Sequence, residues 1–266
     1  MAANAPNTPD NLANFYVPIN HKGDSPMKLV LSIALCFTLL LSNQLHAQED
    51  GFVSLFDGKT LTGWDGNEKY WRVEDGVLIG QTTPDVTTKK NTFLIYKDKE
   101  FSDFDLRFSY KVDGGNSGIQ YRSELIGDWF VKGMQADFED KIHKGKDSFS
   151  GMYFEENGRM FMGQRGDAVI VRTGKENPAK KPEVELIGSV GDREELEKVI
   201  KRDDWNDYRI VARGPMSMHI INGRVMSIGI DEDKTNHRSA GIIAWQLHAG
   251  PPLKIQMKDI RIKELK

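Results

Sequence analysis

From residue 51 onward, apolar and polar residues alternate in short runs that are separated by glycine and aspartate. Segment 103–110 alternates strictly, and we expect the face that holds its apolar residues to lie in the core. That face consists of Phe104, Leu106, Phe108 and Tyr110. Asp75-Gly76 and Asn222-Gly223 each separate two such runs, and both pairs tolerate the positive φ of a tight hairpin turn. The pattern therefore predicts antiparallel hairpins rather than βαβ units.

Further runs later in the chain indicate more strands. They cover residues 208–212, 217–221, 225–230, 240–248 and 253–262. Strands this numerous, without helical patterns between most of them, predict an all-β fold of two packed antiparallel sheets, a jelly-roll sandwich.

One insertion, at about 163–204, interrupts the strands. It predicts a charged loop followed by a single short helix. Asp192 and Glu195 have the spacing of a helix-capping box. The three apolar residues that follow share one helical face: Leu196, Val199 and Ile200.

Length and charge narrow the classes of protein that fit. The chain has 266 residues, and a β-sandwich often exceeds about 200 residues as one domain. We therefore expect residues 48–266 to form a single domain. The 36 basic and 39 acidic residues give a formal charge of -3. Because this charge provides no broad basic surface, we expect no nucleic-acid partner.

Residues 27–47 have the features of a signal peptide, with Lys28 before an apolar run and small residues near a cleavage site. We expect cleavage near Gln48, export to the periplasm or beyond the cell, and no membrane span in the mature protein. Residues 1–26 would be an unusually long leader, so we expect translation to start at Met27. The only cysteine, Cys36, lies in the apolar run, which excludes disulfides and thiol catalysis in the mature protein.

Polar side chains recur at positions i and i+2 in four predicted strands, so both members of each pair point to the same face. The pairs are Gln120 and Arg122, Gln135 and Asp137, Tyr153 and Glu155, and Gln246 and His248. An exposed sheet face explains any one pair, but these residue types also bind sugar hydroxyls and transfer protons. Together they predict a carbohydrate site in which Arg122, Asp137, Glu155 and His248 border a common hollow.

Metal and cofactor motifs are absent from the sequence. His143, His219 and His237 have no companions at ligand spacing, and Glu155-Glu156 alone does not form a metal site. We predict no cofactor and no catalytic metal, while a structural Ca²⁺ held by Asp and Glu oxygens stays open.

Several sequence blocks resemble the 3-keto-disaccharide hydrolase domain family. They occur in order over residues 51–265, at 52–64, 71–78, 101–106, 115–123, 205–210, 221–223 and 241–250. The resemblance implies an exported concanavalin A-like jelly roll that acts on sugars oxidised at C3. Many members carry a glutamate and a glutamine where this chain has Gln135 and Asp137, a pattern that resembles a subgroup of the family.

A ketone at C3 of a sugar acidifies the C2 proton, so a base can form an enolate that expels the C1 substituent, and water then adds back. On this hypothesis the base is His248 or Asp137, and Arg122 with Gln246 stabilises the enolate. The acid is Glu155 or Glu156. The predicted hydroxyl-binding residues are Asn116, Gln120, Gln135 and Tyr153.

Two other functions stay open at this point. A conventional glycosidase needs two carboxylates about 5 to 9.5 Å apart, and Asp137 with Glu155 is the candidate pair. A non-catalytic lectin would share the fold and the polar face but would need no base.

Overall fold

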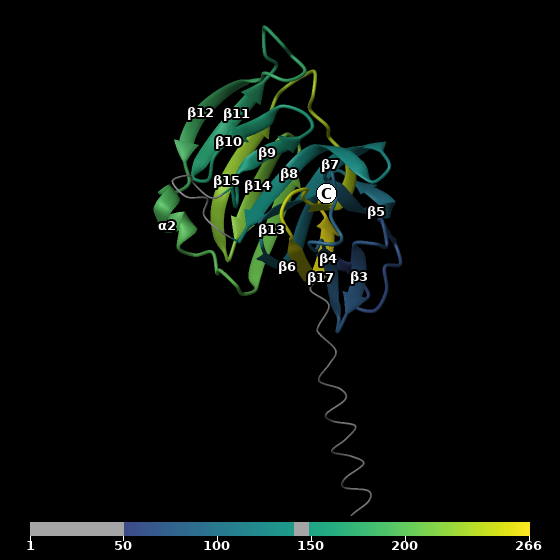
Figure 1. Cartoon of the computed structure of the whole chain (residues 1–266). Helices are drawn as coiled ribbons and strands as arrows, with labels where there is room; N and C mark the ends of the chain where they lie inside the picture. Colours follow the sequence, from purple (N-terminus) through teal and green to yellow (C-terminus); the bar gives the residue numbers. More distant parts are fainter. Residues whose placement is uncertain (1–50, 141–148) are drawn as a thin grey trace, which may run out of the picture. The chain divides into compact units, whose positions relative to one another are not determined.

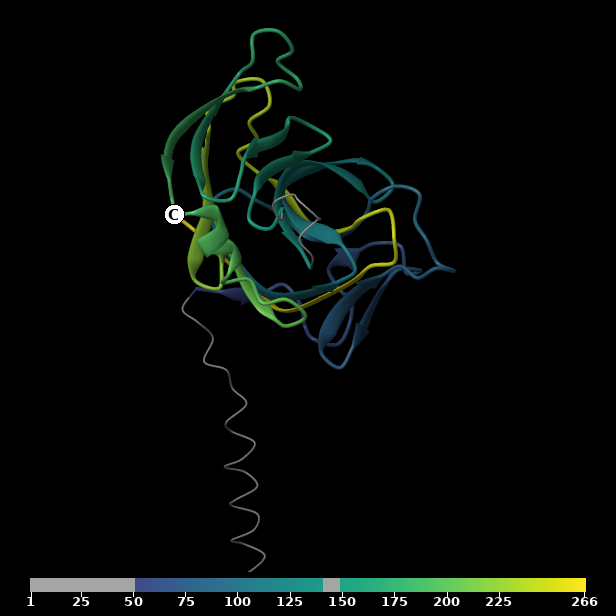
Figure 2. The same cartoon turned by 60° about the vertical axis from the view of Figure 1, so that its left-hand side comes forward.

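A computed structural model describes residues 51–140 and 149–266. The predicted leader, signal peptide and cleavage site therefore lie outside the described residues, as does His143. The described chain forms two packed β-sheets (Figures 1 and 2). This arrangement confirms the all-β two-sheet sandwich predicted from the sequence.

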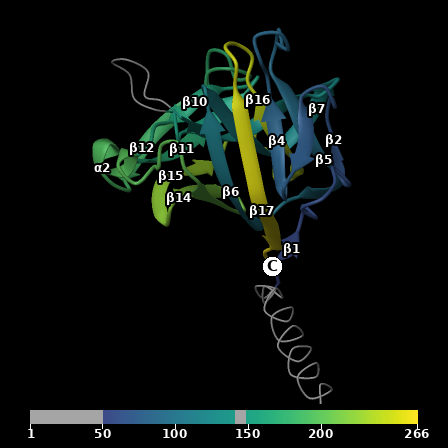
Figure 3. The same cartoon turned by 60° about the horizontal axis from the view of Figure 1, so that its bottom comes forward.

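The larger sheet has ten strands in the order β12-β11-β15-β14-β13-β6-β17-β4-β3, with β1 pairing to β17. Figure 3 shows β17 between β6 and β4. The strands are β1 (Val53–Ser54), β3 (Trp71–Glu74), β4 (Val77–Gln81), β6 (Phe104–Asp113), β11 (Asp167–Arg172), β12 (Glu183–Ser189), β13 (Asn206–Arg213), β14 (Met216–Ile221), β15 (Arg224–Asp231) and β17 (Lys254–Glu264).

The smaller sheet has seven strands in the order β10-β9-β8-β7-β16-β5-β2. They are β2 (Trp64–Asp65), β5 (Thr92–Phe101), β7 (Asn116–Gly127), β8 (Phe130–Glu139), β9 (Tyr153–Glu156), β10 (Met160–Gly163) and β16 (Gly241–Leu247). All neighbours in this sheet are antiparallel.

The two predicted hairpin turns have the expected backbone geometry. Asp75 and Gly76 have φ values of 50° and 78°, and Asn222 and Gly223 have values of 48° and 77°. Positive φ at both central residues matches the right-handed twist of the flanking strands. These turns therefore set the registers of β3 with β4 and of β14 with β15.

Aromatic side chains join the two sheets in the core. The Phe108 ring of β6 meets the Trp245 ring of β16 edge-on, with centroids 4.7 Å apart, and it stacks on Tyr208 at 5.4 Å. All three side chains are buried, as are the four apolar residues predicted for the inner face of 103–110. Burial of this apolar surface drives the packing of one sheet on the other.

The insertion at 163–204 contains more strand than its charged sequence predicts. The expected loop includes β11 and β12, and β11 pairs in parallel with β15. The prediction missed β12 because all of its residues are exposed, so no buried face imposes alternation. The helix itself, α2 (Arg193–Glu197), is present, and the Asp192 side chain accepts hydrogen bonds from the backbone of Glu194 and Glu195.

The described part of the chain holds no helix that is both long and apolar enough to cross a membrane.

Candidate functional site

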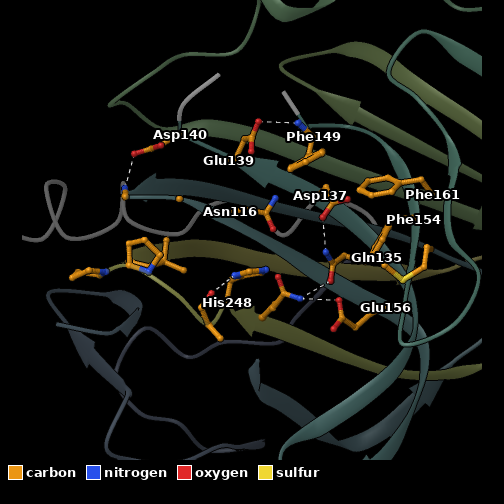
Figure 4. A pocket seen from close by; sticks show the side chains of 18 residues that line it. Asn116, Gln135, Asp137, Glu139, Asp140, Phe149, Phe154, Glu156, Phe161 and His248 are labelled. Carbon is orange, nitrogen blue, oxygen red and sulfur yellow. Dashed lines mark hydrogen bonds between the residues drawn. The ribbon is translucent and has the colours of Figure 1, made fainter. Parts of the chain in front are cut away.

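A cavity of about 640 Å³ lies on the outer face of the seven-stranded sheet (Figure 4). Side chains from β7, β8, β9, β10 and β16 line it, together with the loops 114–115 and 248–253. Its volume lies within the range of about 300 to 1,000 Å³ that is usual for small-molecule sites. The cavity is therefore large enough for a glycoside.

Strand register decides which side chains reach the cavity. Gln135 of β8 lies opposite Gln120 of β7 and Phe154 of β9, so these three share the outer face. Gly118 lies opposite Asp137. A Cβ atom at Gly118 would lie 2.6 Å from Cγ of Gln135, so the glycine leaves room for that side chain.

Hydrogen bonds connect the polar side chains of this face into one network. The amide nitrogen of Gln120 donates to Oε1 of Gln135, and the amide nitrogen of Gln135 donates to Oδ1 of Asp137. Gln246 donates from Nε2 to Oε1 of Gln135 at 3.0 Å and to Oε2 of Glu156 at 3.1 Å. The two Gln246 bonds place both of its amide hydrogens within the protein.

Asn91 connects this network to the loop after β16. Its side chain donates to Oε1 of Glu156 at 3.0 Å and accepts from the backbone N–H of Ala249 at 2.9 Å. The next residue back, His248, is exposed and directs Nδ1 to the carbonyl oxygen of Ala249. Since a carbonyl only accepts, Nδ1 carries the proton of the neutral ring and Nε2 is left as an acceptor.

Burial controls the protonation of Asp137. Removal from water raises the pKa of its carboxyl well above the usual value, and the negative charges of Glu156 and Glu139 raise it further. The hydrogen bond from Gln135 opposes this shift but is the weaker effect. A buried carboxyl in such surroundings favours its neutral, proton-donating form.

Glu156 is held differently at the same sheet face. Burial raises the pKa of its carboxyl overall, and this rise is opposed by hydrogen bonds from Asn91 and Gln246 and by the positive charge that His248 carries when its ring is protonated. The amide hydrogens of Asn91 and Gln246 thus offset part of the effect of burial on this carboxyl. The cavity thus holds a carboxyl stabilised as an acid and another supplied with donors.

Two loops close the end of the cavity near Asp140. The backbone N–H of Gly114 donates to Oδ2 of Asp140 at 2.5 Å, and Asp140 donates from its own N–H to the carbonyl of Gly115. Gly114 has a φ of 92°, and a Cβ there would lie 2.4 Å from the carbonyl oxygen of Pro252. The close approach of these loops therefore requires glycine.

The structure brings together six of the side chains that the sequence predicts for the site. They are Asn116, Gln135, Asp137, Glu156, Gln246 and His248. Gln120 is fully buried and supports Gln135 from the neighbouring strand without lining the cavity.

Arg122 does not border the cavity, contrary to the prediction. Its guanidinium binds the carbonyl oxygens of Ser102 and Gly214 at 2.8 and 2.7 Å and the Asp103 carboxylate at 2.9 Å. The register of β7 shifts between Tyr121 and Glu124, and Arg122 itself has a φ of 47°. This bulge breaks the period of two on which the prediction depends.

Tyr153 and Glu155 also lie away from the cavity, because they occupy the inner face of β9. The Tyr153 hydroxyl accepts a hydrogen bond from Ser217 in the core at 3.2 Å. Glu155 binds the buried guanidinium of Arg159, with Oε2 2.7 Å from Nε. The candidate glycosidase pair of Asp137 and Glu155 therefore does not face one hollow, and the hypothesis that four residues border it is wrong for Arg122 and Glu155.

A family model for the 3-keto-alpha-glucoside-1,2-lyase-like domain matches residues 51–263 of this chain. The chain belongs to this family. A match of this length covers both sheets and every residue that lines the cavity. Membership indicates a carbohydrate-active protein and confirms the family resemblance found in the sequence.

Relatives of this lyase-like domain agree with the assignment. A 3-keto-disaccharide hydrolase of Bacteroides thetaiotaomicron is 37% identical over 93 residues, which are 32% of this chain and 32% of that protein. The chain thus covers about a third of the length of that curated relative.

Two crystal structures of proteins from Parabacteroides distasonis, both proposed to be glycosyl hydrolases, are similar in fold. One is 19% identical with a TM-score of 0.50 and covers 82% of this chain and 95% of that one. The other is 21% identical with a TM-score of 0.51 and covers 80% and 99%. At these identities the similarity shows the fold alone.

Sequence reasoning missed several residues of the site in this lyase-like domain. Asn91 lies in a loop 65 positions before its partner Glu156, and no local pattern connects them. Glu139 continues the outer face at i+2 from Asp137, so the same alternation could have found it. Three aromatic residues of the cavity were missed as well: Phe149, Phe154 and Phe161.

Within residues 51–140 and 149–266, no group of three or more His, Cys, Asp or Glu side chains is placed to hold a metal ion. The prediction that the site uses no metal stays a prediction.

Proposed function

We propose that this chain cleaves glycosides of sugars that carry a ketone at C3, and that the cavity on the seven-stranded sheet is its active site. One observation carries the proposal: Asp137, held in its acid form by burial, lines the same cavity as His248, whose Nε2 is an available acceptor. An acid and a base at one site are what this substrate requires.

The chemistry starts at C2 of the sugar. A base removes the proton from C2, and the electrons of the C2–H bond move toward the C3 ketone to form an enolate. The enolate then expels the C1 oxygen, which leaves as an alcohol after protonation, and a C1–C2 double bond forms. Water adds its oxygen to C1 and a proton to C2, so the net reaction is hydrolysis.

We assign His248 as the base. Its Nδ1–H is held by the carbonyl of Ala249, which orients the ring and leaves the lone pair on Nε2 for the C2 proton. Glu156 lies close enough that a protonated His248 lowers the pKa of the Glu156 carboxyl. A carboxylate at this position stabilises the imidazolium that proton transfer produces.

We assign Asp137 as the acid that protonates the leaving oxygen. Gln135 binds Oδ1 of Asp137, so Oδ2 is the oxygen that can carry and deliver the proton. Burial of its carboxyl and the neighbouring charges of Glu156 and Glu139 keep this proton in place until the leaving oxygen accepts it. The acid role that the sequence suggested for Glu155 or Glu156 therefore passes to Asp137.

Asn116 and Gln246 suit the binding of sugar oxygens. Asn116 lines the cavity and makes no side-chain hydrogen bond within the described residues, so its amide hydrogens can bind the C3 oxygen. Gln246 uses both amide hydrogens on Gln135 and Glu156, which makes it a poor enolate stabiliser. Its buried Oε1 has no partner within the described residues and suits a sugar hydroxyl.

The test is an assay of the purified protein on a 3-keto-glycoside and on the same glycoside without the ketone. We expect cleavage of the 3-keto form only, and a loss of about 10²- to 10⁴-fold in kcat for His248→Ala. Because His248 is exposed, we expect the urea concentration at the midpoint of unfolding to be the same for this variant and the wild type, so that the loss of activity does not come from unfolding. Lys254→Ala, a substitution of a half-buried residue outside the cavity, serves as the matched control.

Each other result contradicts the proposal. Cleavage of the unoxidised parent would indicate a conventional glycosidase. Binding without cleavage of either compound would indicate a lectin. Full activity in His248→Ala would show that His248 is not the base.

A separate measurement distinguishes the two reaction pathways. Elimination followed by hydration releases a 2-hydroxy-3-keto-glycal in the first turnovers, whereas direct hydrolysis forms no such intermediate.

We also propose that the protein is exported after cleavage near Gln48, on the strength of the signal-peptide pattern at 27–47. N-terminal sequencing of the protein recovered outside the cytoplasm tests this directly. A protein that retains residues before 48 and stays in the cytoplasm would contradict it.

A further inference from the structure

The cavity has an apolar wall that the proposed proton transfers do not use. Phe161 lies between two other rings, with its centroid 4.8 Å from that of Phe154 and 5.4 Å from that of Phe149. Met160, the residue before Phe161, also lines the cavity. Figure 4 shows the three aromatic side chains together on one side of the pocket and His248 on the other. We call Phe149, Phe154, Met160 and Phe161 together the aromatic wall.

The outer part of this wall is open to solvent. Phe161 and Met160 each remain 50% exposed, although both are large apolar side chains. Leaving apolar surface in water costs about 25 cal/mol for each Å². Exposed apolar side chains gathered at the edge of a pocket therefore indicate a surface that a ligand covers.

The backbone of the β9–β10 turn holds the wall in position. Met160, the first residue of β10, has a φ of 63°, a conformation that is uncommon for a residue with a long apolar side chain. Such strain persists only where the surroundings enforce it, and it is frequent at ligand sites.

Arg159, the residue before Met160, holds this part of the backbone in place through its hydrogen bonds. Its guanidinium is buried and binds Glu155 at 2.7 Å and Asp231 at 2.8 Å. Its backbone N–H also donates to Oε2 of Glu155 at 2.7 Å. These bonds join the turn to the larger sheet through β15, so the wall is set before a ligand arrives.

The position of the wall identifies the part of the substrate that meets it. The oxidised sugar ring must lie over the polar face, where Asn116, Asp137 and His248 can reach its oxygens and its C2 proton. The leaving group then extends away from those residues. The side chains of the wall provide no strong hydrogen-bonding group, so hydroxyls of a second sugar would lose water there without compensation.

We propose that the aromatic wall is the binding site of the leaving group, and that this chain prefers 3-keto-glycosides with a planar aromatic aglycone over 3-keto-disaccharides. The inference rests on the proposed function, because it concerns the leaving group of that reaction. Aromatic rings in contact stabilise one another by about 0.5 to 1.5 kcal/mol beyond the burial of their surface.

The test compares the 3-keto forms of a phenyl glucoside and of a glucosyl-glucose disaccharide with the same anomeric configuration. For the wild type we expect the higher kcat/KM on the phenyl compound. Phe161→Ala should raise KM about tenfold for the phenyl compound and less than about twofold for the disaccharide, with kcat unchanged. Leu125→Ala, an exposed apolar residue on β7 outside the cavity, is the control and should change neither.

A second measurement keeps the inference separate from the proposed function. Calorimetric titration with unoxidised phenyl glucoside reports binding to the wall without any reaction. If neither 3-keto compound is cleaved, the proposed function fails, and weaker phenyl glucoside binding in Phe161→Ala than in wild type still supports the wall. The inference is overturned if the disaccharide is the better substrate, if Phe161→Ala affects both substrates equally, or if the titration shows no effect of the substitution.

Discussion

The side-chain amide of Gln135 donates a hydrogen bond to Oδ1 of Asp137, two residues further along the same strand. Gln135 receives its own hydrogen bonds from Gln120 on the neighbouring strand β7 and from Gln246 on β16, the strand beyond β7. Three strands thus fix the orientation of one carboxyl group. This arrangement gives Asp137 a defined oxygen for the proton and leads to the first prediction.

Asp137→Asn should reduce kcat about 10²- to 10⁴-fold on 3-keto-glycosides, because the amide keeps the hydrogen bond from Gln135 but cannot deliver a proton. The loss should be smaller for a nitrophenyl leaving group, which departs with little protonation. Steady-state kinetics on a phenyl and a nitrophenyl 3-keto-glucoside measure the difference. An equal loss on both would argue against the acid role.

The same variant should be more stable than the wild type at neutral pH. The folded-state pKa of Asp137 is raised, so the folded state binds more protons than the unfolded state above pH 3.8. The stability of the wild type therefore falls as pH rises above that value, and Asp137→Asn removes this loss. Urea unfolding at pH 5 and pH 8 should show a larger advantage at pH 8. An advantage that does not change with pH would contradict this origin.

Gly118→Ala tests the support of Gln135. The new Cβ would lie 2.6 Å from Cγ of Gln135, so we expect a loss of about 1 to 3 kcal/mol in the free energy of unfolding together with reduced activity. Gly188→Ala is the matched control, because a Cβ there has no atom within 4 Å and lies on the exposed strand β12. Equal stabilities for the two variants would show that Gln135 adjusts freely.

His219 provides a prediction about acid stability. Burial lowers the pKa of its ring to about 4 from 6.5, while Nε2 binds the Tyr121 hydroxyl and Nδ1 binds the carbonyl of Met152, each at 3.0 Å. Between pH 6.5 and 4 the unfolded state takes up a proton that the folded state refuses. Stability should therefore fall by about 3 kcal/mol as pH is lowered through this window.

Urea unfolding at pH 6.5 and pH 4 measures this loss, and it is done in the Asp137→Asn variant. In the wild type, protonation of Asp137 would raise the stability over the same pH range and mask the effect of His219. His219→Gln in the same background should show a flatter profile. The interpretation is wrong if the two profiles have the same slope.

Arg159→Met should lower the free energy of unfolding by about 3 to 5 kcal/mol, because it leaves the buried carboxylates of Glu155 and Asp231 without their cation. Arg172→Met is the comparison. Arg172 pairs with Glu185 at an exposed site, where such pairs contribute about 0 to 1 kcal/mol. Chemical denaturation of both variants compares their losses in the free energy of unfolding. Similar small losses would mean that the buried ion pair contributes little.

Local pattern was enough to predict most of the fold. Alternation at 103–110 and the turns at 75–76 and 222–223 involve neighbours in sequence, so the strands that contain them could be placed without knowing their partners. Pattern failed at β12, whose two faces are both exposed. An exposed strand has no reason to alternate.

The site was harder to predict because it depends on which face of a strand is buried. Residues 153–156 carry carboxylates on both faces, and only Arg159 explains why Glu155 belongs inside while Glu156 faces the cavity. The bulge at Arg122 reverses a face without any sign in composition. Asn91 contacts the site through tertiary structure alone. The sequence alone therefore could not predict which residues of a strand face the cavity, where a bulge reverses that face, or which distant loop contacts the site.

Met160 and Phe161 belong to β10, the last strand of its sheet, which pairs there only with β9. The assigned acid and base lie on β8 and on the loop after β16. Substitutions at positions 160 and 161 can therefore change the side chains of the wall without moving the assigned acid and base. For the proposed reaction, this separation would allow the range of aglycones to change while the acid and the base stay in place.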